Sequence, residues 1–367
     1  MPSFRTIAAT SFLLACASTA SFAAEMPRYA HIFVIIAENR GYDEMARHPE
    51  WTPHLAALAK EYGQASQFFA EDHPSEGNYV AMVGGDTFGI KDDDAFFCKP
   101  GLKNEFCEKS SKPDYADHSI AAKSIADQLA AKGLDWKAYV EDIPAAGSLV
   151  PRWPTSGYAV KGLPSELYAA KHNGFVNFKS VHEAPYPELM KHLVGFAQLD
   201  ADLAAGEMPA YAHIVPNQCN DMHGLHKDES ANVPEDCESE SGLIRRGDAV
   251  IGRLVAMITG SKVWSAPGNT AIVVTYDEND DEGRQSGPQG CCGYDPKSLA
   301  NFGGGHIQTL VITNHGPRHL VDPTRYNHYS LLRTTEDAFG IHEYLGHAAD
   351  SAKGVVSMAP LFAVSQK

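Results

Sequence analysis

Two hydrophobic patterns alternate along the chain. Short apolar runs, typical of buried strands, occur at 31–36, 64–70, 136–140, 211–215, 271–276 and 309–313. Segments in which apolar residues recur at helical spacing, typical of amphipathic helices, occur at 52–62, 75–85, 243–258 and 328–340. Strands that alternate with helices in this way predict an α/β domain built around a central sheet.

Three segments interrupt this alternation. They are rich in Pro, Gly and charged residues and span 91–118, 141–175 and 226–240. Because strand and helix patterns resume after each of them, we predict surface insertions within one domain and not linkers between domains.

The composition excludes several classes of protein. The 367 residues are 44% hydrophobic and 21% charged, which is near the globular average and excludes a disordered chain or a coiled coil. The net charge of −16 argues against a nucleic-acid partner, because phosphate binding requires clustered Lys and Arg.

The amino terminus resembles a secretory leader. Arg5 is the only charged residue before Glu25, and a short apolar stretch lies between them. We predict a signal peptide over residues 1–24, a mature domain over 25–367, and a secreted or periplasmic protein. An alternative stays open, because Leu13 to Cys16 resembles a lipoprotein box and would give a lipid anchor at Cys16. No later segment is predicted to cross a membrane.

Either cleavage removes Cys16 and leaves six cysteines. An even number in an exported protein predicts disulfides. Pairing between neighbours gives Cys98–Cys107, Cys219–Cys237 and Cys291–Cys292, among 15 connectivities that the sequence allows. A zinc site is the competing interpretation, but the chain has no Cys-x-x-Cys pair.

Polar side chains follow directly after two predicted strands. Glu38 and Asn39 follow the strand at 31–36, and Asp277 and Glu278 follow the strand at 271–276. The carboxyl ends of strands in an α/β sheet form its ligand-binding edge. We therefore predict that these four residues hold one divalent cation, since carboxylate and carbonyl oxygens suit such ions. Acidic surface loops are the alternative.

Ser75 is the candidate nucleophile. It begins the predicted helix at 75–85, where free backbone N–H groups favour an anionic phosphoryl group. A metal can activate a serine without a histidine base. Asn78, one turn later, is the candidate donor to a phosphoryl oxygen. The alternative for Ser75 is a simple helix cap.

Several segments resemble a known family. They lie in order along the chain and include HIFVIIAENRGYDE, HPSEGNYVAMVGGD, IVPNQCNDMHG, IVVTYDENDDEG, GGGHIQTLVIT and YNHYSLLRTTEDAFG. Together they resemble the phosphoesterase family of bacterial acid phosphatases and phosphatidylcholine-type phospholipases C, within the alkaline phosphatase superfamily. The resemblance implies an alkaline-phosphatase-like fold with a mostly parallel central sheet flanked by helices. It also implies that Glu38, Asn39, Ser75, Asp277 and Glu278 bind the metal and form the nucleophilic centre.

The function that we expect is that of an exported, metal-dependent phosphoric ester hydrolase. Its substrate would be a small phosphate ester, and Ser75 would carry a phosphoserine intermediate. We predict His223 or His306 as the imidazole that protonates the leaving alcohol, which would favour mildly acidic operation. A phospholipase C or phosphodiesterase is one alternative, for which Phe96, Phe97 or Tyr139 could form an aromatic cage around choline. A catalytically silent exported binding protein is the other.

Overall fold

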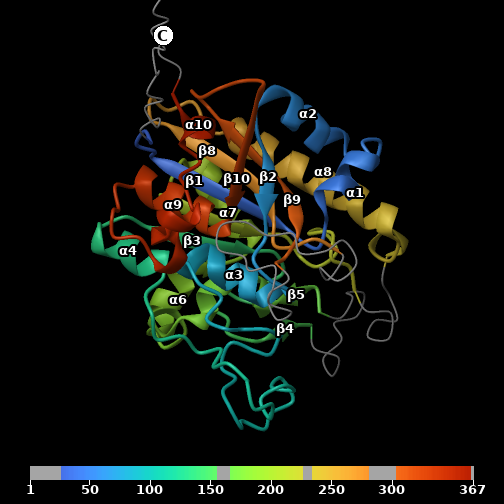
Figure 1. Cartoon of the computed structure of the whole chain (residues 1–367), viewed down its shortest axis with the longest axis vertical. Coiled ribbons are helices and arrows are strands. Elements are labelled where there is room, and N and C mark those ends of the chain that lie inside the picture. The colour runs from blue at the N-terminus through green and yellow to red at the C-terminus, as the bar shows by residue number, and fades with distance from the viewer. Residues whose placement is uncertain (1–25, 155–165, 226–233, 281–302, 365–367) are drawn as a thin grey trace, which may run out of the picture.

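The computed structural model describes residues 26–154, 166–225, 234–280 and 303–364 (Figure 1). Within these residues, eight strands form one sheet in the order β10-β2-β9-β8-β1-β7-β3-β6. Only β9 among them runs antiparallel to its neighbours, so the sheet is mostly parallel, as predicted. The strands are β1 (His31–Ala37), β2 (Gly63–Phe69), β3 (Trp136–Val140), β6 (Leu193–Val194), β7 (Tyr211–Val215), β8 (Thr270–Tyr276), β9 (His306–Thr313) and β10 (Leu320–Asn327).

Helices cover both faces of this sheet (Figure 1). Helices α2 (Pro53–Glu61) and α8 (Glu240–Thr259) pack together, and α3 (Ser75–Gly84) packs against α9 (His328–Ala338). The central strands are covered on both faces, which is why every residue of β8 is buried and apolar residues dominate it. The remaining α-helices are α1 (Tyr42–Arg47), α4 (Ile125–Ala131), α5 (Lys179–His182), α6 (Tyr186–His192), α7 (Phe196–Ala205) and α10 (Ala359–Phe362). No helix in the described ranges is long and apolar enough to cross a membrane.

Strand β10 is the main element that the hydrophobic pattern missed. Its sequence LVDPTRYN carries Pro323 and no apolar run. It lies at the edge of the sheet, so one side of the strand forms no hydrogen bonds to another strand and a proline is tolerated there. Val321, 56% exposed, illustrates how little of this strand enters the core.

The three segments predicted as insertions differ from one another. Residues 91–118 form no helix or strand, as expected. The segment 141–175 contains β4 (Arg152–Trp153), β5 (Tyr168–Ala169), and the 3-10 turn η2 (Ala170–His172), with η3 (Gly174–Asn177) beginning near its end. Both 3-10 turns contact α3. The interpretation of 141–175 as a purely surface segment is therefore wrong. Part of the segment 226–240 lies outside the described residues; its end forms the turn η4 (Glu235–Cys237) and begins α8.

Gly174 explains the close approach of these turns to α3. A Cβ atom at this position would lie 2.2 Å from the carbonyl oxygen of Tyr79. Any side chain would therefore push η2 and η3 away from the helix that Ser75 begins. The absence of a side chain keeps residues 171 and 172 beside that helix.

Two of the three predicted disulfides are confirmed. Cys98 pairs with Cys107 and Cys219 pairs with Cys237. The first closes a loop of the 91–118 segment, and the second ties the chain after β7 to the start of α8. Cys291 and Cys292 lie outside the described residues, as does Cys16.

A buried ionic network holds the 91–118 segment against α3. The imidazole of His118 is fully buried, with Nδ1 2.9 Å from Oε1 of Glu76 and Nε2 3.2 Å from Oδ1 of Asp92. The side chain of Asn177 donates to the same Glu76 oxygen. Burial opposes charge on the imidazole, but its hydrogen bonds to Asp92 and Glu76 raise the pKa of His118 to about 10. Since Glu76 follows Ser75 directly, the network fixes the first turn of the helix.

We expect His118→Leu to destabilise the protein by about 3–5 kcal/mol at pH 6, because it leaves the buried carboxylate of Glu76 and the partly buried one of Asp92 without a cation. A pKa that folding raises stabilises the protein fully below the unfolded value near 6.5, and this contribution is lost as the pH rises through about 10. The deficit of the variant should therefore shrink between pH 6 and pH 10.5 in thermal melts. His342→Leu, at a histidine whose side chain is 71% exposed, is the control. An equal deficit at both pH values would contradict the ionic role of His118.

Candidate active site

The site begins where two neighbouring parallel strands end. Strands β1 and β8 pair with Ala37 opposite Tyr276, so Glu38 and Asp277 leave the sheet at the same edge. The backbone N–H of Asp277 donates to the carbonyl of Ala37 over 3.1 Å. The backbone N–H of Asn39, in the left-handed region with φ of 52°, donates to Oδ1 of Asp277 over 3.0 Å. The predicted meeting of these two strand ends is therefore present.

Ser75 lies against the carboxylates that these strands deliver. Its Oγ is 3.2 Å from Oε2 of Glu38 and 3.1 Å from Oε1 of Glu278. Ser75 is the first residue of α3 and is buried. The hydroxyl can thus donate its proton to either of two carboxylates that come from different strands, while the helix amino terminus faces the same point.

Asn78 holds the loop that precedes the nucleophile. Its Oδ1 accepts hydrogen bonds from the backbone N–H groups of Glu71 and Asp72, and its Nδ2 donates to the carbonyl of Asp72 over 2.8 Å. The side chain is completely buried. These bonds give Asn78 a structural task, and the contact to a phosphoryl oxygen that the sequence predicts stays a prediction.

Four carboxylates crowd around Ser75 with almost no solvent. Glu38, Asp221, Asp277 and Glu278 are each at most 4% exposed. Burial raises the pKa of Glu38 and of Asp221 to about 7. Burial, followed by repulsion from neighbouring carboxylates, raises the pKa values of Asp277 and Glu278 well above the usual range. Such a concentration of buried carboxylates favours a bound cation.

The oxygen atoms of the cluster suit a cation. Oδ1 of Asn39 and Oδ2 of Asp277 are buried and accept no hydrogen bond within the described residues. Such unpaired buried acceptors are costly unless a ligand compensates for them. Oxygen-only donors of this kind fit a hard divalent cation. The predicted set of Glu38, Asn39, Asp277 and Glu278, with Ser75, is therefore compatible with the metal that the sequence implies.

A second set of possible ligands lies beside the first and includes nitrogen. One ligand atom each of Glu38, His172 and His223 lies within 4.8 Å of the other two. Nε2 of His172 is 2.9 Å from Oε1 of Glu38, and its Nδ1 is 3.3 Å from Oδ2 of Asp221. Glu38 belongs to both sets, so one cation or two could be bound along this line of side chains.

The geometry of His223 favours a neutral imidazole. Its Nδ1 lies 2.7 Å from the carbonyl of Gly224 and must carry the proton that this carbonyl accepts. Burial, followed by the charge of Lys171, lowers the pKa of His223 well below its usual value. In this tautomer Nε2 carries no proton and is the nitrogen that the metal-ligand set of Glu38, His172 and His223 would use. The proton-donor role that the sequence predicts is not favoured by this arrangement.

His306 lies apart from the nucleophile. Its ring stacks on Tyr42 at 4.3 Å and lies 5.0 Å from the ring of Phe69, and its Nε2 is 3.0 Å from the carbonyl of Ser66. It does not line the cavity at Ser75. The glycine before it is required for a contact with another residue, because a Cβ atom on Gly305 would lie 2.3 Å from Cγ of Asn279. Burial lowers the pKa of His306 as well.

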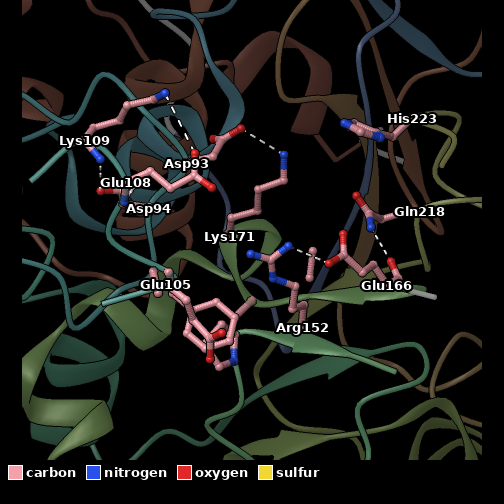
Figure 2. A pocket seen from close by; sticks show the side chains of 15 residues that line it. Asp93, Asp94, Glu105, Glu108, Lys109, Arg152, Glu166, Lys171, Gln218 and His223 are labelled. Atoms are coloured by element: carbon pink, nitrogen blue, oxygen red, sulfur yellow. Dashed lines mark hydrogen bonds and ion pairs between the residues drawn. The ribbon is translucent and has the colours of Figure 1, made fainter. Parts of the chain in front are cut away.

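Lys171 is the functional candidate that the sequence did not suggest. It lines the cavity at Ser75 and reaches toward Asp93 in Figure 2, with its Nζ 2.9 Å from Oδ2 of Asp93. The charge of Asp93, followed by that of Glu38, outweighs burial and raises the pKa of Lys171 above its usual value. The other oxygen of Asp93 accepts the backbone N–H of Glu76 in the first turn of α3. A permanent positive charge therefore lies next to the nucleophile.

Lys171 and His172 stand in the segment that was predicted to be a surface insertion. The sequence signal that could have marked them is the run Ala-Lys-His-Asn-Gly at 170–174, in which polar residues precede a glycine.

His73 is a third neighbour of the nucleophile, with Nδ1 2.6 Å from Oε2 of Glu278. His328, the first residue of α9, is buried, and its Nε2 lies 2.9 Å from the carbonyl of Tyr276.

Comparisons with known proteins agree with this geometry. A model of the Phosphoesterase family matches residues 47–342. The matched range begins after Glu38 and Asn39, so the strand geometry is what places these two residues at the site.

Curated relatives match most of the chain. The phosphatidylinositol-3-phosphatase of Mycobacterium tuberculosis is 25% identical over 323 residues, which are 87% of this chain and 80% of that protein. The phosphate-repressible acid phosphatase of Penicillium chrysogenum is 27% identical over 292 residues, which are 78% of this chain. This chain spans about half the length of that fungal relative, with 54% covered.

A solved structure shows the same fold. A protein in the alkaline phosphatase superfamily from Vibrio parahaemolyticus superposes with a TM-score of 0.50 at 12% identity. The match covers 87% of this chain and 68% of that protein. The predicted alkaline-phosphatase-like fold is confirmed.

We expect Mg²⁺, Mn²⁺ or Zn²⁺ to raise the melting temperature of protein stripped with a chelator, and Asp277→Asn to reduce that rise. At a free cation concentration of 100 times Kd, binding stabilises the folded state by about 2.7 kcal/mol. The same substitution should raise the melting temperature of the stripped protein, because it removes one of four crowded carboxylates. Asp200→Asn, at an exposed residue of α7, is the matched control. A rise that Asp277→Asn leaves unchanged would contradict the predicted ligand set.

Proposed function

Because the chain belongs to the Phosphoesterase family, we propose that it is a phosphoric ester hydrolase that cleaves phosphate monoesters through a phosphoserine on Ser75. One observation carries this proposal: the Ser75 hydroxyl, at the amino terminus of α3, lies 3.1–3.2 Å from carboxylates delivered by two strands. The names of the relatives, phosphatidylinositol-3-phosphatase and acid phosphatase, support the same reaction class.

The residues around Ser75 each have a separate role in the first half of the reaction, which transfers the phosphoryl group to Ser75. Glu38 or Glu278 accepts the hydroxyl proton as Oγ attacks phosphorus, and the bond to the alcohol oxygen breaks on the opposite side, so that the alcohol leaves as an alkoxide and takes its proton from water. The backbone N–H groups of the first turn of α3 and the ammonium of Lys171 stabilise the negative charge on the phosphoryl oxygens. Each of these groups is fixed before the substrate arrives, which is how preorganised charge lowers a barrier.

The second half of the reaction removes the phosphoryl group from Ser75. A water molecule attacks phosphorus on the side that the alcohol has left, and the imidazole of His223, which lines the same cavity, takes up its proton and later releases it to solvent. Ser75 leaves as the alkoxide and recovers its proton from the neighbouring carboxyl group. Inorganic phosphate is the product.

A divalent cation fits this site. Glu38, Asn39, Asp277 and Glu278 would hold it through oxygen, or Glu38, His172 and His223 through mixed ligands. When bound, such a cation lowers the pKa of a serine hydroxyl and neutralises phosphoryl charge. The unpaired acceptors at Asn39 and Asp277 are the structural support for this part of the proposal.

The two alternatives receive less support. A choline-specific phospholipase C would need an aromatic cage at the site. Phe96 and Tyr139 are buried, and neither they nor Phe97 lines the cavity at Ser75. A silent binding protein would have no reason to keep a serine hydroxyl against two buried carboxylates.

We also propose that the chain is exported with cleavage after a leader at residues 1–24. The apolar stretch near the amino terminus supports this, as do the two disulfides, which persist in oxidising compartments. The lipid anchor at Cys16 is the competing form of export.

Replacing Ser75 with Ala should lower turnover of p-nitrophenyl phosphate by at least about 10³-fold, because it removes the hydroxyl that forms the phosphate ester. The melting temperature should stay within about 2 °C of the wild-type value. Ser180→Ala, at an exposed serine of α5, is the matched control and should keep full activity. Near-wild-type activity of Ser75→Ala would rule out the phosphoserine route.

Intact-mass measurement of protein purified from the periplasm or culture medium should show a mature chain that begins near residue 25. A chain that begins at a lipid-modified Cys16 would establish the anchored form. A full-length chain confined to the cytoplasm, with Cys98 and Cys107 reduced, would contradict export altogether.

A further inference from the structure

A second cavity lies next to the nucleophile and has a different lining. It encloses about 310 Å³ and shares Asp93, Lys171 and His223 with the cavity that contains Ser75. The two cavities therefore meet at the residues that would surround a bound phosphoryl group. Its outer wall comes from the disulfide-closed 91–118 segment and from β4 and β5 (Figure 2).

We propose that this second cavity is the subsite for the alcohol part of the substrate, and that it selects an alcohol with several hydroxyl groups and no further phosphate, such as a sugar or polyol phosphate. The inference rests on the proposed function, since it assumes that Ser75 takes the phosphoryl group. It adds the chemical class of the group that leaves.

Size is the first argument. A cavity of about 310 Å³ is at the lower end of small-molecule sites, which span about 300–1,000 Å³. It accommodates one ring-sized polar group. A pair of acyl chains would require a long apolar channel, whereas the apolar wall among the described lining residues consists mainly of small side chains and one ring, Ala95, Ala169, Ala170, Pro151 and Phe106.

Hydrogen-bonding capacity is the second argument. Basic and acidic side chains alternate around the cavity, and Figure 2 shows Arg152 reaching toward Glu166, with NH1 2.6 Å from Oε1. Lys109 and Glu105 lie on the other side of the opening. Donors and acceptors side by side suit a hydroxyl group, which donates one hydrogen bond and accepts others.

Charge is the third argument. The lining holds the carboxylates Asp93, Asp94, Glu105, Glu108 and Glu166 against the cations Lys109, Arg152 and Lys171. All three cations are already paired, Lys171 with Asp93, Arg152 with Glu166 and Lys109 with Glu108. A second phosphate on the alcohol would meet an excess of negative charge, so a bisphosphate should bind more weakly than a monophosphate.

The lining also disfavours a quaternary ammonium group. Among its described residues Phe106 is the only benzene-type ring, and the guanidinium of Arg152 lies over it at 5.0 Å from the ring centre. That aromatic face is thus occupied by a cation from the protein. A neutral polyol matches the size of the cavity and the donors, acceptors and charge of its lining.

The test compares three substrates with the purified mature protein: hexose 6-phosphate, hexose 1,6-bisphosphate and p-nitrophenyl phosphate, which lacks hydroxyl groups. Wild-type protein should hydrolyse the hexose monophosphate with a kcat/KM at least about 5-fold above that for the bisphosphate. Arg152→Met keeps the stem that covers Phe106 and removes the donors. It should lower kcat/KM for hexose monophosphate by about 10-fold, mostly through KM, and change that for p-nitrophenyl phosphate by less than about 2-fold, since one hydrogen bond to a charged group contributes about 1.5 kcal/mol or more.

Lys109→Met is a second variant, at an exposed residue whose loss should not disturb folding, and should lower kcat/KM for the hexose monophosphate selectively. Lys112→Met, on the same segment but outside the cavity lining, is the matched control and should change neither substrate. Equal losses on both substrates, no loss in either variant, or a preference for the bisphosphate would overturn the subsite. Absence of any hydrolysis by wild-type protein, p-nitrophenyl phosphate included, would instead overturn the proposed function on which the subsite depends.

Discussion

The crowding of four buried carboxylates around one serine is the constraint on which the rest of the site depends. Glu38, Asp277 and Glu278 lie together because β1 and β8 are adjacent parallel strands that end at one edge of the sheet. Asp221, in the segment after β7, joins them because its carbonyl accepts the backbone N–H of Glu38. Parallel pairing forces the residues after each strand into proximity, whatever their charge. A cluster of this kind is stable only with cations close by, which explains both the imidazoles beside it and its fit to a divalent metal.

The positive groups of the site come from outside the sheet. Lys171 and His172 belong to a short 3-10 turn that lies on α3 because Gly174 has no side chain to keep it away. Asp93 ties Lys171 to the first turn of the same helix. The helix that presents the nucleophile is therefore also the element onto which both the compensating charges and the 91–118 segment pack.

The local hydrophobic pattern was sufficient to predict those parts of the molecule whose structure depends on neighbouring residues in one strand or helix. The buried run at 31–36 and the polar pair that follows it predicted both β1 and the position of Glu38. The same reasoning could not find Lys171 or His172, because what brings them to Ser75 is a contact between segments almost 100 residues apart. It missed β10 for a related reason: an edge strand with Pro323 needs no apolar run, since only one of its sides joins the sheet.

The site therefore combines two parts with different physical requirements. The carboxylates and Ser75 are fixed by strand ends and a helix start, where a shift of one residue would turn each side chain away from the others. The second cavity is built from a disulfide-closed loop and the β4–β5 pair, which contribute no strand to the main sheet. Substitutions in those segments leave the strand ends unchanged, so the alcohol that is accepted can vary while the phosphoryl centre stays the same. Asp93 and Lys171 cannot be substituted in this way without affecting the phosphoryl centre, because they line both cavities. Asp93 also accepts a backbone N–H in the first turn of the helix that Ser75 begins.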